Sequence, residues 1–516
     1  MENPAPLPRM KLLLATIFTL TVIEFLQSGM LAFGASPISG QINASPEEYS
    51  IVTAAYAAVA ITAIAKMRWF IERLGWRRFI LLSIAFFLTG AGISGLATSF
   101  PQFLLGRLVM GMGGAAFMTS ARMLVNLIPP SPARIKGIIA FALGLSCAIS
   151  AAPWIVAQFV GADWWNGIFV LLAALALLAA FLAAITLPDE PLPEESHTHA
   201  HFGPLLVMAG GSFLALFAVQ RALYDFYSTL PYLLALTAAG VAAVVWFAWH
   251  QHGHERPLLR LRQLARRRYL TALGVFTVGY MVLGANNTML PSLVQRALGF
   301  PWHVAGTVQA IGLTASIAVF FLKLRIIRTA PSPQKFYVAG FGALALFGWL
   351  LSGLTLEADL WRHVLPAIGL YGMFIVLILA TTAIHGFTEF QDDPVAFFHA
   401  QQVKNMLAQF GTALGVAGAN LLLQWRTAEH YALLNRRFVS GDVEMSRQLE
   451  QLGTWFASAN GAHGAAQLAL GQLAQTLNQQ AALLAQLEYF RLLVFVGLGL
   501  AALMAWQRTL SVPKPA

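Results

Sequence analysis

The chain has little charge and almost no cysteine. Asp, Glu, Lys and Arg make up 10% of its 516 residues, whereas hydrophobic residues make up 58%. Soluble domains carry charge at about a quarter of their positions. The composition therefore excludes an ordinary soluble protein and is typical of a chain that crosses a bilayer many times. Cys147 is the one cysteine, which excludes an intrachain disulfide.

Motifs of several enzyme classes are also missing. The chain has no Gly-x-x-x-x-Gly-Lys-Ser/Thr phosphate loop, no HExxH zinc motif and no GxSxG nucleophile elbow. These absences argue against ATP-driven transport and against an enzyme, and we expect no catalytic residue and no cofactor. The net charge of +10 does not indicate nucleic-acid binding, because the basic residues lie mostly in short loops between apolar segments, where topology explains them.

The apolar segments predict an all-α integral membrane protein with fourteen spans. Each is close to the roughly 20 residues that cross a bilayer. Lys and Arg gather in alternate loops, which places both termini in the cytoplasm by the positive-inside rule. Two of these inside loops, 189–195 and 389–393, are acidic exceptions. We place the spans at 12–35, 49–69, 79–98, 102–124, 135–158, 167–187, 204–223, 229–249, 269–291, 303–324, 335–354, 363–385, 397–422 and 489–507.

Two segments between spans predict the domain organisation. A linker rich in Pro, Glu and His occupies 188–203, and a long polar external region occupies 423–488. Six leucines of the external region recur at near-helical spacing, which favours an amphipathic helix against the membrane or a partner, or a helical hairpin that caps the fold. We expect three parts: residues 1–187, residues 188–268, and residues 269–516 including the external region. The leucines are Leu468, Leu470, Leu473, Leu477, Leu483 and Leu484.

Two charged residues inside predicted spans are candidates for proton coupling. Glu24 is the only acid well inside any span, and Arg107 lies within the glycine-rich segment Leu104–Met118. Charges at membrane depth are costly and usually functional. We hypothesise that Glu24 binds and releases a proton while Arg107 tunes the exchange. The alternatives are a static Glu24–Arg107 pair, or a Glu24 bonded to a neighbouring helix.

Polar and adaptable side chains within the spans are candidates for a substrate cavity. Three of them share one face of the thirteenth span, at 402, 405 and 409. The alternative for the polar residues is hydrogen bonding between helices, and for the apolar ones ordinary packing. The candidates are Gln27, Tyr56, Met110, Asn286, Asn287, Gln309, Gln402, Asn405 and Gln409.

Two His-x-His-x-His runs lie on the predicted cytoplasmic side. Imidazoles there could converge on Zn²⁺ or Ni²⁺. The alternative, two solvated loops that happen to be rich in histidine, is the one we adopt, so we predict no metal site. The runs are His197, His199 and His201, and His250, His252 and His254.

Five segments resemble motifs of one family, and along the chain they follow the order of the family's motifs. They are Arg107–Gly114, Glu72–Arg78, Trp165–Phe169, Leu290–Gln295 followed by Leu298-Gly299, and Leu473–Ala485. They resemble the fourth-helix motif, the loop motif between helices two and three, the entry to helix six, the end of helix nine and the approach to the last helix of the fourteen-helix drug/proton antiporters. These are the EmrB- and QacA-like branch of the major facilitator superfamily.

The resemblance implies a major facilitator fold, with two six-helix bundles, two inserted helices and a substrate site between the bundles. It implies proton-driven export of lipophilic or toxic organic compounds across the cytoplasmic (inner) membrane. For Gram-negative relatives it also implies a periplasmic adaptor and an outer-membrane channel, for which the 423–488 region is a plausible contact surface. The loop motif implied to govern conformational change is Glu72, Arg73, Gly75, Arg77 and Arg78.

The chain also departs from the family pattern. Arg68 stands where the loop motif begins with Gly, and Glu72 where the family has Asp. Of the fifth-helix motif only Pro153 remains. The family's first-helix Asp falls near Gln27 or Ser28, about one turn after Glu24. Three alternatives therefore stay open: an exporter of one metabolite such as a siderophore or an organic acid, a metal exporter, and a membrane sensor that does not transport.

Overall fold

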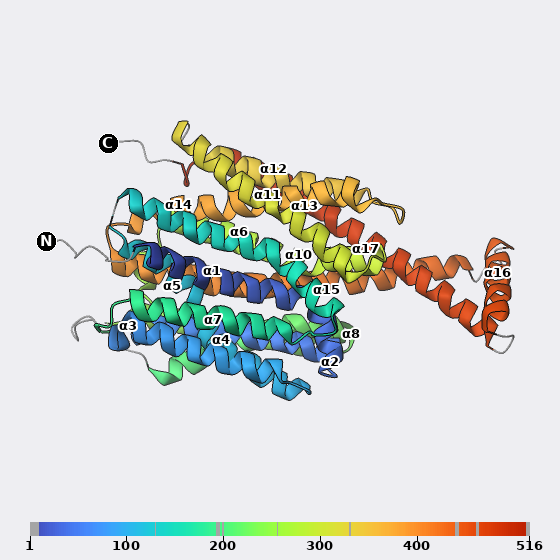
Figure 1. Cartoon of the computed structure of the whole chain (residues 1–516), viewed down its shortest axis with the longest axis horizontal. Coiled ribbons are helices and arrows are strands. Elements are labelled where there is room, and N and C mark those ends of the chain that lie inside the picture. The colour runs from blue at the N-terminus through green and yellow to red at the C-terminus, as the bar shows by residue number, and fades with distance from the viewer. Residues whose placement is uncertain are drawn as a thin grey trace.

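The structure, a computed structural model, is a bundle of long helices (Figure 1). It describes residues 10–129, 131–191, 197–198, 201–254, 256–329, 332–438, 443–460 and 464–511, and no strand occurs among them. The α-helices are α1 (Met10–Phe33), α2 (Ala35–Gln41), α3 (Pro46–Gly95), α4 (Phe100–Gly114), α5 (Ala116–Leu127), α6 (Pro132–Gly161), α7 (Gly167–Thr186), α8 (Phe202–Gly253), α9 (Leu261–Leu264), α10 (Arg267–Ser292), α11 (Trp302–Thr329), α12 (Gln334–Ser352), α13 (Leu365–Ile375), α14 (Thr381–His385), α15 (Pro394–Phe438), α16 (Val443–Asn460) and α17 (Ala465–Trp506).

Within the described part of the chain, 13 helices are long and apolar enough to cross a membrane. One of them, Glu47–Gly95, has 49 residues. At 1.5 Å per residue a straight helix of that length would measure about 73 Å, more than twice the bilayer core. Gly75 interrupts it with φ 78°. This helix therefore accounts for two of the predicted spans, 49–69 and 79–98, and reconciles 13 helices with fourteen crossings.

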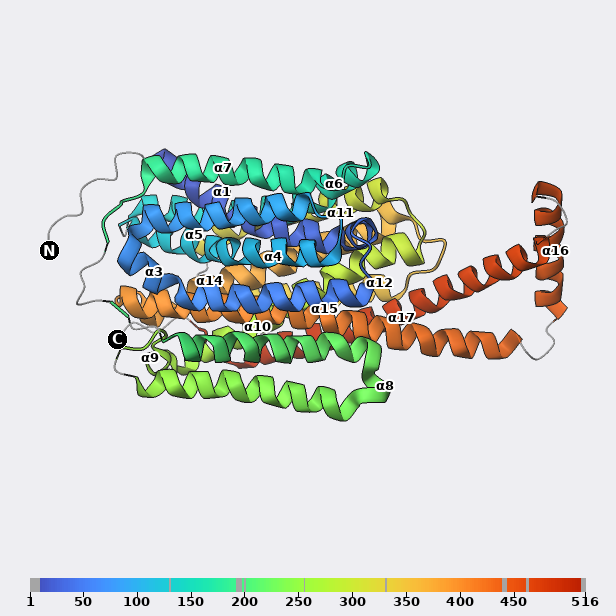
Figure 2. The ribbon, with the colours of Figure 1, turned by 90° about the horizontal axis from the view of Figure 1, so that it is seen from below.

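The inserted pair of spans forms one element, α8. Its 52 residues contain Pro231 and two apolar stretches, Phe202–Ala222 and Thr229–Gly253. Figure 2 shows the two halves of α8 side by side at one edge of the molecule. Gly211 and Gly240 let them approach, because a Cβ on Gly240 would lie 2.7 Å from the carbonyl oxygen of Gly211.

The remaining membrane helices pack into two sets. In the first, α3 lies against α4 and α7, and α1 against α5 and α6; in the second, α10 lies against α15, α11 against α13, and α12 against α13 and α17. Between the sets, α6 contacts α11, and α15 contacts both α3 and α8. Small residues allow the closest approaches, since a Cβ on Gly415 of α15 would lie 2.0 Å from the Met281 carbonyl oxygen of α10. The three-part division into 1–187, 188–268 and 269–516 stays a prediction.

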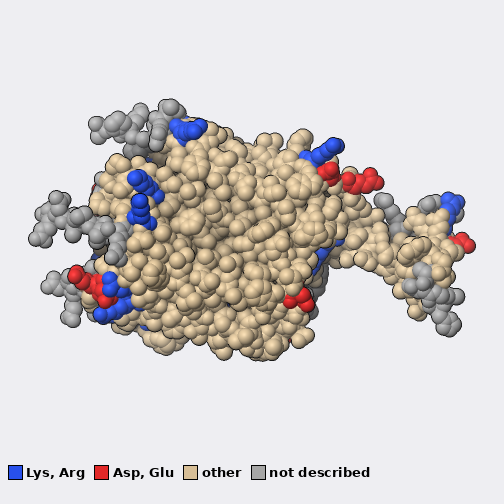
Figure 3. Space-filling view, viewed as in Figure 1, with Lys and Arg blue, Asp and Glu red and all other residues tan. Residues whose placement is uncertain are grey.

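On the face of the bundle that Figure 3 shows, charge lies at the two ends. In Figure 3 the Lys, Arg, Asp and Glu side chains lie near both ends, and the face between them is free of charge. Figure 1 shows that α1 begins and α17 ends at the same end, as an even number of crossings requires. The structure is that of a multi-pass membrane protein.

The external region is a hairpin of helix extensions. The predicted spans 397–422 and 489–507 are parts of the much longer α15 and α17, which project beyond the bundle with α16 across their tip (Figures 1 and 2). At its base Arg426 pairs with Glu488, with 2.6 Å between Nη2 and Oε1. Leu473, Leu477 and Leu483 are buried, whereas Leu468, Leu470 and Leu484 are exposed. The hairpin stands out from the fold and does not cap it.

Candidate functional site

Glu24 lies at the junction of the two helix sets. Its side chain is 5% exposed and accepts one hydrogen bond on each oxygen. Gln27 Nε2, one turn along α1, donates to Oε2 at 3.0 Å, and Gln409 Nε2 of α15 donates to Oε1 at 3.1 Å. The carboxyl group therefore links the first helix to the helix that begins at Pro394.

Arg107 is connected to Glu24 only indirectly, through Tyr56 and Gln27. Gln27 Nε2 also donates to the Tyr56 hydroxyl at 2.8 Å, and the Arg107 guanidinium carbon lies 4.2 Å from the centre of the Tyr56 ring. Arg107 Nη1 donates to Met110 Sδ at 2.9 Å. None of the ion pairs among the described residues joins Glu24 to Arg107. We weighed two alternatives to proton exchange, a static Glu24–Arg107 pair and a Glu24 bonded to a neighbouring helix. This arrangement matches the second.

The predicted polar face of the thirteenth span lies against the first helix set. Gln402 Nε2 donates to the carbonyl oxygens of Ile64 at 2.7 Å and Ala65 at 3.0 Å. Asn405 Nδ2 donates to Thr119 Oγ1 at 2.6 Å. In this conformation both side chains make the interhelical hydrogen bonds that we weighed against a cavity role.

A small cavity gathers another part of the predicted set. Its wall includes Asn286 and Asn287 of α10, Gln309 of α11 and Pro153 of α6, together with α1 and α13 side chains. Asn286 Oδ1 accepts from the Tyr489 hydroxyl at 3.1 Å. Gln309 Nε2 is buried and has no hydrogen-bond partner among the described residues. This free amide is a donor available to a polar group in the cavity. The remaining residues of the cavity wall are Phe25, Ser28, Gly29, Phe33, Ile149, Ala152, Leu283, Leu290, Pro291, Leu313 and Tyr371.

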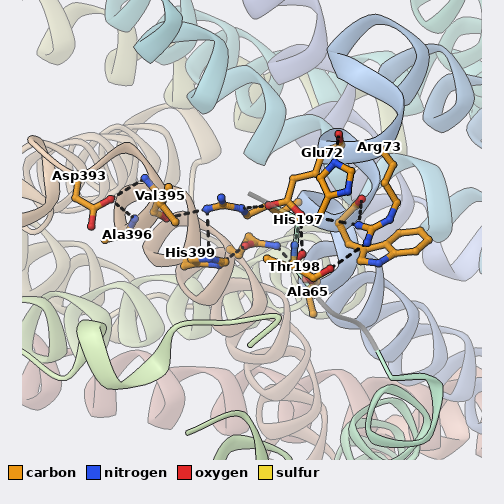
Figure 4. Close-up of polar contacts among 12 residues, drawn as sticks. Ala65, Glu72, Arg73, His197, Thr198, Asp393, Val395, Ala396 and His399 are labelled. Atoms are coloured by element: carbon orange, nitrogen blue, oxygen red, sulfur yellow. Dashed lines mark hydrogen bonds and ion pairs between the residues drawn. The ribbon is translucent and has the colours of Figure 1, made fainter. Parts of the chain in front are cut away.

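The loop motif holds the linker that follows the first helix set (Figure 4). Glu72 is completely buried. Its Oε1 lies 2.6 Å from Arg68 Nε, and its Oε2 accepts from the backbone N–H of Thr198 at 2.7 Å and from its hydroxyl at 2.8 Å. Arg73 Nη2 donates to the Thr198 carbonyl oxygen at 3.1 Å. The carboxylate thus pairs with Arg68, the residue that departs from the family's Gly.

The rest of the loop motif contacts the beginning of the linker. Arg77 Nε donates to the Leu187 carbonyl oxygen at 2.9 Å, and Arg78 Nε lies 3.2 Å from Asp189 Oδ1. A Cβ on Gly75 would lie 2.9 Å from the Asp189 carbonyl oxygen, so the close approach requires glycine.

A hydrogen-bonded chain continues from the loop motif into α15 (Figure 4). Arg68 Nη1 lies 3.3 Å from His399 Nε2, and because arginine only donates, this nitrogen of His399 is the acceptor. His399 Nδ1 then donates to Gln402 Oε1 at 3.1 Å. The chain from Glu72 to Gln402 connects α3 with the first three turns of α15.

One histidine of each run lies within hydrogen-bonding distance of the other run. His201 Nε2 and His254 Nε2 lie 3.1 Å apart, whereas His197 Nε2 lies 3.1 Å from the Glu72 carbonyl oxygen. His199 falls outside the described residues. In the part of the chain that the structure describes, no three His, Cys, Asp or Glu residues are grouped so that they could hold a metal ion.

Two buried lysines and one partly buried arginine did not enter the predicted site. Lys323, near the end of the predicted span 303–324, is 2% exposed within α11 and donates to Thr381 Oγ1 at 2.8 Å. Lys404 of α15 is 4% exposed, and Arg122 of α5 has a buried Nε. The available signal was a basic residue inside a predicted span, at 102–124, 303–324 and 397–422.

The fold, with a buried acid and a cavity between two sets of membrane helices, defines a membrane transporter. The sequence model of the Major Facilitator Superfamily matches residues 17–419, and the chain belongs to this superfamily.

Relatives of known name support the same class. "Putative multidrug resistance protein MdtD" of Cronobacter sakazakii is 24% identical over 391 residues, which are 75% of this chain and 80% of the relative. "Uncharacterized MFS-type transporter YhcA" of Bacillus subtilis is 21% identical over 444 residues, 85% of this chain and 80% of the relative.

Solved structures share the fold at low sequence identity. An auto-inhibited peptide transporter of the POT family has a TM-score of 0.57 and 16% identity, with 99% of each chain covered. A bacterial homologue of the human lysosomal transporter Spinster, inward-facing and unoccupied, has a TM-score of 0.58 and 14% identity, with 97% of this chain and 98% of that chain covered.

Proposed function

We propose that this chain exports lipophilic or toxic organic compounds across the cytoplasmic membrane in exchange for protons. The single observation that carries the proposal is the buried Glu24 carboxyl group, bonded to α1 through Gln27 and to α15 through Gln409. The names of the MdtD relatives support the choice of substrate class.

A proton on Glu24 has a direct structural consequence. Both carboxylate oxygens accept N–H donors, so a proton on Oε1 would place an O–H group opposite the N–H group of Gln409. That bond would then break, or the amide would have to turn. Proton binding would therefore loosen the contact between α1 and α15, as coupling of protonation to alternating access requires.

The loop motif supplies the second element of the cycle. Opening at the predicted cytoplasmic end must separate α3 from α15, and hence break the bonds of Arg68 with His399 and of Gln402 with Ile64 and Ala65. In this proposal the Glu72–Thr198 bonds hold the linker while the two helix sets rock apart.

The hairpin supports the proposed partners. Its tip and arms expose Trp455, Leu468 and Leu470, which suit a helical periplasmic adaptor that leads to an outer-membrane channel. The arms also bear many glutamines after residue 471, which suit a polar rim around such apolar contacts.

Proton movement in everted membrane vesicles tests the proposal. We compare wild type, Glu24→Gln and the control Glu357→Gln, whose side chain is exposed outside the membrane helices. Lipophilic cations, weak acids and siderophores are added to acidified vesicles. We expect substrate-dependent proton release from wild type and Glu357→Gln, but not from Glu24→Gln. Equal release from Glu24→Gln would move the proton site elsewhere. Silence from all three folded proteins would contradict antiport and favour the sensor.

A further inference from the structure

Two cations lie in the contact between the two helix sets without a visible counter-charge. Lys404 of α15 is 4% exposed, and Arg122 belongs to α5 of the opposite set. None of the ion pairs among the described residues includes either one. Aromatic rings lie near both: Lys404 Nζ is 5.3 Å from the Phe276 ring centre, and the Arg122 guanidinium carbon is 5.9 Å from that of Phe397.

Polar atoms without a hydrogen-bond partner lie on the same two helices. Arg122 Nε, Gln401 Nε2 and Asn405 Oδ1 are buried and have no hydrogen-bond partner among the described residues. Positions 401, 404 and 405 share one face of α15, because they are separated by three and four residues. Asn405 is bonded to Thr119, one turn before Arg122 on α5, so the unused atoms of both helices lie in the same contact. Buried polar groups in native proteins are almost always satisfied, which indicates that a ligand completes this set.

The charges of the interface favour a negative ligand. Two basic residues, Arg122 and Lys404, lie there, and Glu24 is the only acid well inside a span. Because Asn405 of α15 is bonded to Thr119 of α5, the two cations lie in one contact, and like charges there repel each other. A lipophilic cation would add to this repulsion, whereas an anion would relieve it, and unpaired charges at membrane depth typically mark substrate pathways.

We propose that Arg122 and Lys404 form the binding subsite for the acidic group of an amphipathic organic anion, a carboxylate or a sulfonate. This inference rests on the proposed export function and narrows its substrate class. Arg122 binds the two oxygens of the acid and Lys404 neutralises its charge. The buried side chains of Met118 on α5, Phe397 on α15 and Phe276 on the neighbouring α10 contact the apolar body of the compound. The anion bridges α5 and α15 and must leave before the two sets separate fully.

Matched probes test this assignment. Everted vesicles with an imposed pH gradient receive radiolabelled 2-naphthoate or naphthyl-trimethylammonium, which share a ring system and differ in charge. The proteins are wild type, Lys404→Gln, Arg122→Gln, Lys404→Arg and the control Lys11→Gln at an exposed position of α1. We expect wild type to accumulate naphthoate in preference to the cation. Either glutamine variant should lose about tenfold or more of naphthoate uptake, the effect of one lost charge-assisted bond. Lys404→Arg and Lys11→Gln should retain it.

A second measurement separates binding from folding. Naphthoate added to each purified protein in detergent should raise the melting temperature of wild type and Lys404→Arg, but not of the glutamine variants. Uptake of the cation with proton release, and no response to naphthoate, would overturn the anion subsite and leave the proposed export intact. Unchanged naphthoate uptake by Lys404→Gln and Arg122→Gln would also overturn the subsite. No uptake and no proton release with either probe or with the wider panel would contradict the export function itself.

Discussion

Gln409 of α15 donates a hydrogen bond to Oε1 of Glu24 on α1, at 3.1 Å. The two residues lie 385 positions apart in the chain and belong to opposite helix sets. A proton on Glu24 therefore acts on a contact between the sets, and several expected outcomes follow from that and from the loop motif.

Replacement of Gln409 by leucine should weaken the link between proton binding and transport. The variant loses one hydrogen bond to a charged acceptor, which contributes about 1.5–3 kcal/mol. We expect a lower melting temperature and transport that depends less on the imposed pH gradient. The measurement is substrate uptake with and without the gradient. Gln158→Leu, at an exposed position of α6, is the control, and a Gln409→Leu protein with the gradient dependence of wild type would contradict the assigned role.

Buried and exposed ion pairs of the loop motif should differ sharply in their effect on stability. Glu72→Ala leaves Arg68 buried without its carboxylate, and such a loss costs about 3–5 kcal/mol. Asp189→Asn removes the exposed pair with Arg78, worth about 0–1 kcal/mol. Thermal unfolding of the purified proteins measures both. Equal small shifts would show that the Glu72 side chain is solvated in solution.

Alanine at Gly75 should destabilise the protein, whereas alanine at Gly92 should not. Gly75 has φ 78° and ψ 168°, a region that is almost exclusive to glycine and costs of order 1–3 kcal/mol for other residues. Its new Cβ would also meet the Asp189 carbonyl oxygen. Gly92, in the same helix, has open space around it, and alanine there improves helix propensity. Melting temperatures and proteolysis of the linker 188–203 report both changes, and no loss at Gly75 would contradict the linker contact.

Addition of Zn²⁺ should leave the melting temperature unchanged. The described residues bring together two histidine nitrogens, of His201 and His254, whereas a structural zinc site takes four ligands. Calorimetry with Zn²⁺ and Ni²⁺, before and after EDTA treatment, should detect no binding. A saturable heat, lost in His201→Gln, would revive metal export as a function.

The spans could be predicted from the sequence because a bilayer imposes a fixed apolar length on every crossing helix. Glu24 and Arg107 stood out for the same reason, since charge is rare at that depth. Their partners could not be predicted, because Gln409 and Tyr56 come from other helices and only packing decides which side chains meet. The hydrogen bonds from Thr198 to Glu72, 126 residues earlier in the chain, likewise depend on where the linker folds back.

The long external helices show a limit of hydropathy. It identifies the apolar parts 397–422 and 489–507 but not that α15 and α17 continue unbroken past them, because a polar helix outside the membrane has no apolar signal. Lys404 and Arg122 were visible as charges inside predicted spans, yet their lack of partners becomes evident only when both helices are in place.

The continuity of α15 gives the protein a lever arm. With 45 residues it is about 68 Å long, and it carries Gln402, Gln409 and the base of the hairpin on one rod. If proton binding or release at Glu24 tilts this rod slightly, as proposed, the displacement would be largest at α16, far outside the bundle (Figure 2). An external partner bound to the tip would be displaced in each transport cycle. A partner that holds the tip fixed would stop the cycle.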